Sequence, residues 1–267
     1  MHFDLIQSIS LAGKASVPND DRAGCHGALG WVIDGATDLG PPGLVGARGG
    51  AAWIAEAADR GFAASEAGSI AGVYRDVFDR IARAYAAARQ RDPLGDWELP
   101  IAAGLAARLG VGTVAWGALG DCVGLLAHGD TVTRFGRAPS KAAEGDQAAS
   151  VAHIDADALR VSLRPGRAAR RSAVISTDPA DLARLESGTL PCAPGDEMLL
   201  MTDGFAALVE VYGVYDPATL IAALRRDGLA ALVVELRAIE AGDAARDRFP
   251  RFKPSDDATA LWLRVAD

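Results

Sequence analysis

The residues of this sequence best suited to chemistry are aspartates placed where apolar segments begin or end. Asp34 closes residues 28–34 (ALGWVID), and a glycine follows it directly. Asp203 closes residues 197–203 (EMLLMTD) and is also followed by a glycine. A carboxylate at the end of a buried strand is costly in free energy unless it is paired or bound to a cation. The full set of these acids is Asp20, Asp21, Asp34, Asp203, Asp256 and Asp257.

Strand-end carboxylates from one sheet are expected to converge at one rim, where they repel one another and cannot all ionise alone. A hard divalent cation relieves this repulsion, and Mg²⁺ or Mn²⁺ prefers oxygen ligands. A single Asp-Gly pair more often closes a hairpin than binds a metal. Two such pairs with matching apolar segments, followed by a third acidic pair before the last strand, favour a metal site.

The elements that must position these acids are predicted from hydrophobic periodicity. Strands are expected at residues 3–11, 28–34, 197–203 and 258–265, and a glycine-punctuated β-meander at residues 101–109, 113–119, 123–127 and 131–135. Helices are expected at residues 51–64, 69–90, 217–226 and 229–241, with helical pieces over 141–171, a loop at 17–24 and irregular structure at 35–50. Because the helices bunch between strands instead of alternating with them, the pattern predicts an α+β fold in a single domain, residues 1–267.

Composition limits the class of function. The 267 residues are 50% hydrophobic and 23% charged, which is typical of a globular protein, and the formal net charge of −8 disfavours nucleic-acid binding. The apolar stretch 99–127 is interrupted by Arg108 and Asp121, so it falls short of the about 18 apolar residues that a membrane span needs. Three separated cysteines and the absence of a signal-peptide pattern predict reduced thiols and a cytoplasmic location.

Five short motifs occur in an order that resembles the metal-dependent protein phosphatases, the PPM or type 2C family. The likeness covers nearly the whole chain. It implies a four-layer α/β/β/α sandwich in which helices flank two antiparallel sheets. The motifs are NDD at 19–21, VIDGAT at 32–37, LGDC at 119–122, LLMTDGF at 199–205 and SDDAT at 255–259.

The resemblance also implies roles for individual residues. Asp34 is similar to the family's carboxylate that bridges two Mn²⁺ or Mg²⁺ ions, and the carbonyl of Gly35 would bind one of them. Asp203 and Asp256 look like further ligands. Asp34, Asp203 and Asp256 are therefore the expected catalytic residues.

Four further acidic positions fall within the motifs that resemble the family's. Asp20, with Asp21 beside it, matches an acid near the second ion. Asp121 matches the aspartate that holds a weaker third ion, although an acid in a hairpin turn is an equally good interpretation. Asp257 stands where the family often has asparagine.

The sequence departs from the family at the position that grips the substrate phosphate. Ser16 stands where the family usually has arginine. The candidate substitutes are Lys14 and Arg22, although a lysine lacks the bidentate fork of arginine. Arg48, in the glycine-rich segment 46–50, is another candidate phosphate contact, and an ordinary solvated arginine is the alternative interpretation.

The activity implied by the resemblance is hydrolysis of phosphoserine or phosphothreonine in a phosphorylated protein substrate, with a water activated by two ions and no protein nucleophile. A monomer without nucleic-acid or membrane partners is assumed. Two alternatives stay open. Ser16 and the glycine-rich residues 40–50 would also suit a phosphatase of a small metabolite, and a non-catalytic regulatory module is conceivable, although such a module has no chemical need for the acids.

Overall fold

The computed structural model describes residues 1–137, 156–169 and 173–267. Of the helical pieces expected over residues 141–171, one helix, α4 (Ala156–Ala168), lies within this part of the chain. The remaining residues of that expectation, 141–155 and 170–171, lie outside the described residues.

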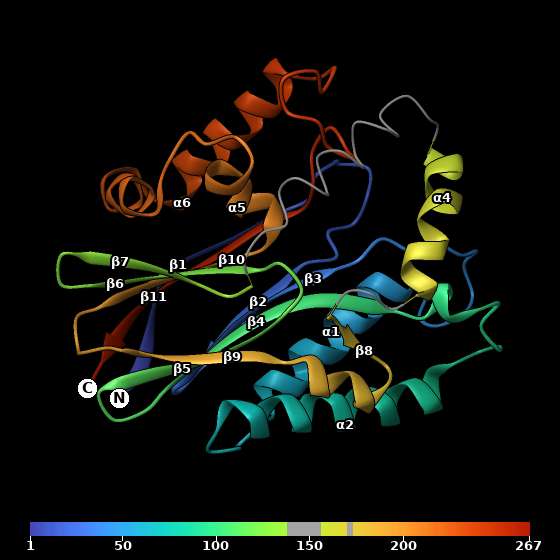
Figure 1. Cartoon of the computed structure of the whole chain (residues 1–267), viewed down its shortest axis with the longest axis horizontal. Coiled ribbons are helices and arrows are strands. Elements are labelled where there is room, and N and C mark those ends of the chain that lie inside the picture. The colour runs from blue at the N-terminus through green and yellow to red at the C-terminus, as the bar shows by residue number, and fades with distance from the viewer. Residues whose placement is uncertain (138–155, 170–172) are drawn as a thin grey trace.

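Two antiparallel sheets lie face to face at the centre of the fold (Figure 1). The first sheet, in the order β1-β11-β10-β6-β7, consists of β1 (His2–Leu11), β6 (Val123–His128), β7 (Thr131–Phe135), β10 (Glu197–Met201) and β11 (Ala258–Ala266). The second sheet, in the order β2-β3-β4-β5-β9, consists of β2 (Arg22–His26), β3 (Leu29–Gly35), β4 (Ile101–Leu109), β5 (Thr113–Leu119) and β9 (Glu186–Pro191), and the short β8 (Ile175–Ser176) pairs with β4.

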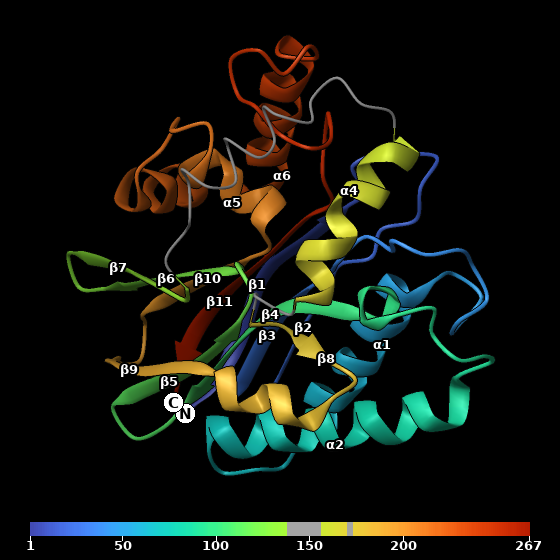
Figure 2. The same ribbon diagram turned by 45° about the vertical axis from the view of Figure 1, so that its right-hand side comes forward.

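Helices cover the outer face of each sheet, as Figures 1 and 2 show from two directions. Helices α1 (Gly50–Ala63) and α2 (Ile70–Ala88) pack on the second sheet, and α5 (Asp203–Glu210) and α6 (Pro217–Gly242) pack on the first. Two 3₁₀ helices, η1 (Asp96–Glu98) and η2 (Pro179–Arg184), complete the described elements. The expected four-layer α/β/β/α sandwich is confirmed.

The four layers explain why the central strands read as unbroken apolar runs. Ile33 of β3 packs among the residues of α1 and α2, whereas its neighbour Val32 packs between the sheets. In β10, Leu199 faces α5 and α6, and Leu200 faces the other sheet. Since successive side chains of a strand point to opposite faces, a strand covered on both faces needs apolar residues at every position.

Most expected elements are confirmed, and the exceptions have local causes. Residues 17–24 were expected to be a loop, but β2 begins at Arg22, because pairing with β3 outweighs its polar, half-buried sequence. Residues 217–226 and 229–241 were expected as separate helices. They form α6 with a kink at Gly228, whose φ of 77° is accessible to glycine.

The apolar stretch 99–127 forms β4, β5 and the start of β6. In the described ranges we find no helix with both the length and the apolar character that crossing a membrane requires.

The space between the sheets is the part of the core on which the sandwich depends. Leu200 is fully buried there, so Leu200→Ala is expected to lower the free energy of unfolding by about 2–5 kcal/mol through lost burial and a cavity. Urea denaturation measures this change. The control Val234→Ala, at a side chain of α6 that is 70% exposed, should change stability by no more than about 0.5 kcal/mol. Equal losses in the two variants would contradict this placement of the core.

Candidate functional site

The acids singled out in the sequence gather at one end of the sandwich. Met201, the last residue of β10, pairs with Ala260 near the start of β11 and with Val123 at the start of β6. At the same end, β3 finishes at Gly35. The chain termini lie at the opposite end, since His2 pairs with Ala266. We call this set of side chains the acidic rim: Asp20, Asp21, Asp34, Asp121, Asp203 and Asp256.

The expectation that these acids belong to one sheet is wrong. Asp34 lies one residue before the end of β3 in the second sheet, whereas Asp256 precedes β11 of the first sheet. Asp203 does not end β10 but begins α5, because the strand already stops at Met201. The rim therefore spans both sheets, and face-to-face packing brings its two halves together.

Asp34 and Asp203 form the centre of the rim. Their side chains lie close together, and each carboxyl group affects the pKa of the other. Loss of hydration raises the pKa of Asp34 well above its usual range, and the charges of Asp21 and Asp256 raise it further. Loss of hydration followed by the charge of Asp34 does the same for Asp203. The Oδ1 atom of Asp203 is buried and has no hydrogen-bond partner among the described residues.

Asp21 lies behind this pair and is the most buried acid of the rim, with 3% of its surface exposed. Its Oδ2 accepts a hydrogen bond from the Thr202 hydroxyl at 2.8 Å, and the Thr202 hydroxyl in turn accepts one from the Thr259 amide at 3.0 Å. Burial raises the pKa of Asp21 well above its usual range despite the hydrogen bond from Thr202. These contacts join the start of β2 to β10 and β11.

Asp257 holds two backbone segments beside the rim, one at Gly13 and one at Asp20. Its Oδ1 accepts a hydrogen bond from the Gly13 amide at 2.8 Å, and its Oδ2 accepts one from the Asp20 amide at 2.7 Å. Both carboxylate oxygens are thereby used by backbone donors. Asp257 holds the loop that carries Asp20 and Asp21 against the first sheet, which explains an acid where the family resemblance gives asparagine.

Backbone packing at the rim is close. A Cβ atom on Gly204 would lie 1.9 Å from the carbonyl oxygen of Asp257. A Cβ atom on Gly35 would lie 2.8 Å from the Ala51 carbonyl oxygen and 2.9 Å from that of Asp20. The glycines that follow Asp34 and Asp203 are therefore required by close approach of the chain, whatever else they do.

Asp121 occupies the turn between β5 and β6 and is exposed. The preceding Gly120 has a φ of 91°, and a Cβ atom there would lie 2.3 Å from the Ala103 side chain. This is the geometry of a tight turn. The charge of Asp121 still reaches the centre of the rim, where it contributes to the raised pKa values of Asp34 and Asp203.

The three candidate phosphate contacts differ in their surroundings. Arg48 lies at the rim, with Nη2 2.9 Å from the Asn19 carbonyl oxygen and 3.5 Å from Asp20 Oδ1. Arg22 donates to the Asn19 and Asp21 carbonyl oxygens and so braces the loop. Lys14 is exposed in the loop after β1. Arg48 is therefore the best placed of the three.

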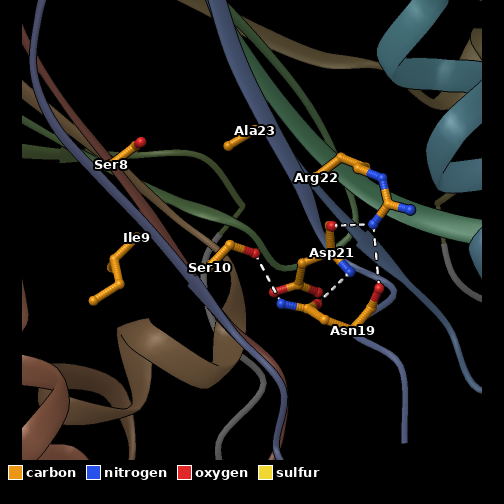
Figure 3. A pocket seen from close by; sticks show the side chains of 7 residues that line it. All are labelled: Ser8, Ile9, Ser10, Asn19, Asp21, Arg22 and Ala23. Atoms are coloured by element: carbon orange, nitrogen blue, oxygen red, sulfur yellow. Dashed lines mark hydrogen bonds between the residues drawn. The ribbon is translucent and has the colours of Figure 1, made fainter.

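A cavity of about 380 Å³ opens beside the rim, between β1 and the start of β2 (Figure 3). Within it, the Asn19 side chain donates to Ser10 Oγ and accepts from the Asp21 amide. The cavity thus leads from the surface to the buried Asp21. It is lined by Ser8, Ile9, Ser10, Asn19, Asp21, Arg22 and Ala23.

Sequence reasoning missed two residues of the site. Thr202 was read as part of an apolar strand, although a hydroxyl before the acid could have indicated a hydrogen bond. Lys253 is absent from the predicted site, yet its Nζ lies 2.8 Å from Asp256 Oδ1. The sequence signal that could have indicated Lys253 is a lysine three residues before Asp256, close enough along the chain for the two side chains to form an ion pair.

The rim suits a divalent cation by its chemistry. All its side-chain donors are carboxylate oxygens, and the buried, unpaired Oδ1 of Asp203 is an atom that a cation would satisfy. In their observed orientations, however, no three His, Cys, Asp or Glu side chains of the described residues are arranged to hold an ion. Asp21 and Asp256 are instead engaged by Thr202 and Lys253. The carboxylate groups therefore lie near one another, but some of their side chains would have to rotate before they could coordinate one ion.

Solved structures with the same architecture include serine/threonine phosphatases. PstP/Ppp of Mycobacterium tuberculosis aligns with a TM-score of 0.62 at 15% identity, over 100% of both chains. The catalytic domain of PstP in complex with two manganese ions aligns with a TM-score of 0.57 at 16% identity, over 100% of this chain and 99% of that one. The PPM phosphatase MsPP of Mycobacterium smegmatis, in complex with cacodylate, gives 0.57 at 17% identity over 98% and 99%.

The chain therefore has the fold of the PPM serine/threonine phosphatases, and at this identity the likeness shows the fold alone. No protein-family model and no curated protein sequence matches the chain.

The contact at Gly204 gives a first test of the rim. Gly204→Ala is expected to push the Asp257 carbonyl away and lower the free energy of unfolding by about 1–3 kcal/mol. Chemical denaturation measures the loss. Gly242→Ala, at the end of α6 where a Cβ atom meets nothing within 4 Å, is the matched control and should be near neutral. If Gly204→Ala leaves the free energy of unfolding unchanged, the backbone of Gly204 does not lie this close to the Asp257 carbonyl oxygen in solution.

The raised pKa of Asp34 gives a second test. A folded-state pKa above the unfolded value means that metal-free stability falls as pH rises from about 4 toward that raised pKa. Asp34→Asn removes this penalty, and its amide can donate to Asp203. In EDTA at neutral pH the variant should therefore be more stable than wild type by on the order of 1 kcal/mol.

Urea denaturation at about pH 3 and about pH 7 checks this, because the gain should largely vanish at the lower pH, where both states bind the proton. Asp130→Asn, in the exposed turn between β6 and β7, is the control and should show no such pH dependence. A variant less stable than wild type at neutral pH would mean that the carboxylates are not crowded.

Proposed function

We propose that this protein is a Mn²⁺- or Mg²⁺-dependent phosphomonoesterase that removes phosphate from phosphoserine and phosphothreonine in proteins. The observation that carries the proposal is the Asp34–Asp203 pair with the buried, unpaired Oδ1 of Asp203 at its centre. The fold shared with serine/threonine phosphatases supports the same reaction class.

The acids of the rim would hold the ions. Asp34 and Asp203 supply the central oxygens, with the Gly35 carbonyl and Asp256 as further donors and Asp20 on the side of Arg48. When bound, a pair of such ions lowers the pKa of a water molecule and neutralises phosphoryl charge. The related PstP structure holds two manganese ions, which supports this number. Asp121, exposed in its turn, is the proposed donor for a weaker third ion.

The neighbouring residues position this set. Thr202 fixes the carboxylate of Asp21 through its hydroxyl, and Asp257 fixes the Asp20 amide. Cys122 is buried beneath the rim, and burial followed by the charge of Asp34 raises the pKa of its thiol well above the usual range. A thiol that keeps its proton is a poor nucleophile, which supports attack by water over attack by cysteine.

Arg48 is the proposed contact to the substrate phosphate. Its guanidinium lies beside Asp20 at the edge of the rim and is 45% exposed, so it can turn toward an incoming anion. Its planar fork suits two phosphoryl oxygens. Arg48 would thus take the role of the arginine that Ser16 replaces.

Phosphatase activity is tested with p-nitrophenyl phosphate and a phosphoserine/phosphothreonine peptide panel in Mn²⁺. Wild type should hydrolyse both, and EDTA should abolish turnover. Asp34→Asn and Asp203→Asn should each lower kcat by about 10²-fold or more, because the ions would lose a central ligand. Asp130→Asn is the control that keeps full activity.

Metabolite phosphates tested in parallel separate the two substrate classes. Hydrolysis of metabolite phosphates but not of phosphopeptides would contradict the proposal that the substrate is a protein. The proposed phosphomonoesterase reaction would still stand. Equal rates for wild type and both rim variants would exclude the proposed chemistry.

A further inference from the structure

Lys253 is the cation in closest contact with the acidic rim among the described residues. Its Nζ donates a hydrogen bond to Asp256 Oδ1 at 2.8 Å. The carboxylates of Asp34 and Asp203 also attract it electrostatically. The hydrogen bond places the ammonium group of Lys253 against the carboxylates of the rim.

The backbone on both sides of Lys253 is fastened. The Phe252 carbonyl oxygen accepts from Arg246 Nη1 at 3.1 Å, and the Pro254 carbonyl oxygen accepts from Arg251 Nε at 3.0 Å. Arg251 is itself paired with Asp243, with side-chain exposures of 13% and 9%. The loop before β11 thus presents Lys253 to the rim from a fixed position, and its side chain, 43% exposed, is the part free to move.

The other partner of this contact is fixed as well. The Asp256 carbonyl oxygen accepts a hydrogen bond from Arg237 Nη2 at 2.9 Å, and Arg237 is held by the buried Glu240. Asp256 Oδ1 also accepts from the Asp257 amide at 2.9 Å. The Asp256 carboxylate therefore has one oxygen saturated by donors from this chain and cannot offer that oxygen freely to a metal.

We propose that Lys253 competes with the divalent ion for Asp256 and so sets the metal affinity of the site. The inference rests on the proposed function, because it concerns the same rim. A bound ammonium neutralises Asp256 in the metal-free protein, and a divalent ion that approaches the same carboxylate must displace it or bear its repulsion. The contact thereby stabilises the metal-free site and weakens metal binding.

Two measurements with opposite expected signs test the competition. By calorimetric titration with MnCl₂, Lys253→Met should bind Mn²⁺ about three- to tenfold more tightly than wild type, the size expected for a half-exposed ion pair. In EDTA the same variant should melt at a lower temperature than wild type, because Asp256 then faces Asp34 and Asp203 without its counterion. A lysine with a purely structural role would lower the melting temperature without tightening metal binding.

Matched variants separate the local contact from the general effect of charge. Lys253→Arg keeps the cation and should bind Mn²⁺ as wild type does. Arg264→Met removes one positive charge at the opposite end of β11, where Arg264 is 53% exposed, and should leave the affinity unchanged.

The outcomes distinguish this inference from the proposed function. If wild type binds Mn²⁺ and Lys253→Met binds it equally or more weakly, the competition is overturned and the proposed function is untouched. If neither protein binds Mn²⁺, both are overturned. Tighter binding by Lys253→Met together with a lower melting temperature in EDTA supports the competition.

Discussion

Repulsion among carboxylates at one end of the sandwich is the constraint on which the site depends. Asp21, Asp34 and Asp203 are brought together with little water to screen them, and each raises the pKa of another. Such crowding opposes folding at neutral pH, so the surrounding structure must tolerate it. The ammonium group of Lys253, 2.8 Å from Asp256 Oδ1, offsets part of this negative charge.

The sandwich tolerates this cost because its cores lie elsewhere. One apolar layer fills the space between the sheets, and two more lie under the helices. All three are built by strands whose ends reach the rim. The rim is thus held by strands buried on both faces, and close backbone contacts such as that at Gly204 leave its segments little room to separate. Rigid support of this kind is what a site needs if its charged groups are to stay near one another.

The cations around the rim differ in how they are held. Arg22 is committed to backbone carbonyl groups, whereas Arg48 and Lys253 each contact a rim carboxylate from a half-exposed position. Arg48 and Lys253 can therefore respond when the charge of the rim changes. Arg48 approaches from the side of Asp20 and Lys253 from the side of Asp256, and the separate roles that we propose for them, with anion and metal, rest on these positions.

The sequence by itself determined most strands, most helices and the acids near their ends, because apolar periodicity and Asp-Gly pairs are local properties, but it did not indicate β8 or β9. It did not determine that Asp34 and Asp256 belong to different sheets, that Asp203 starts α5, or that β2 forms in a polar segment. β2 depends on pairing with the neighbouring β3, and the convergence of Asp34 and Asp256 depends on packing between residues far apart in the chain. The contact of Lys253 with Asp256 is close in sequence, yet its consequence arises only because folding places Asp34 and Asp203 beside it. Charge crowding is a property of three-dimensional distance, which spacing along the chain does not encode.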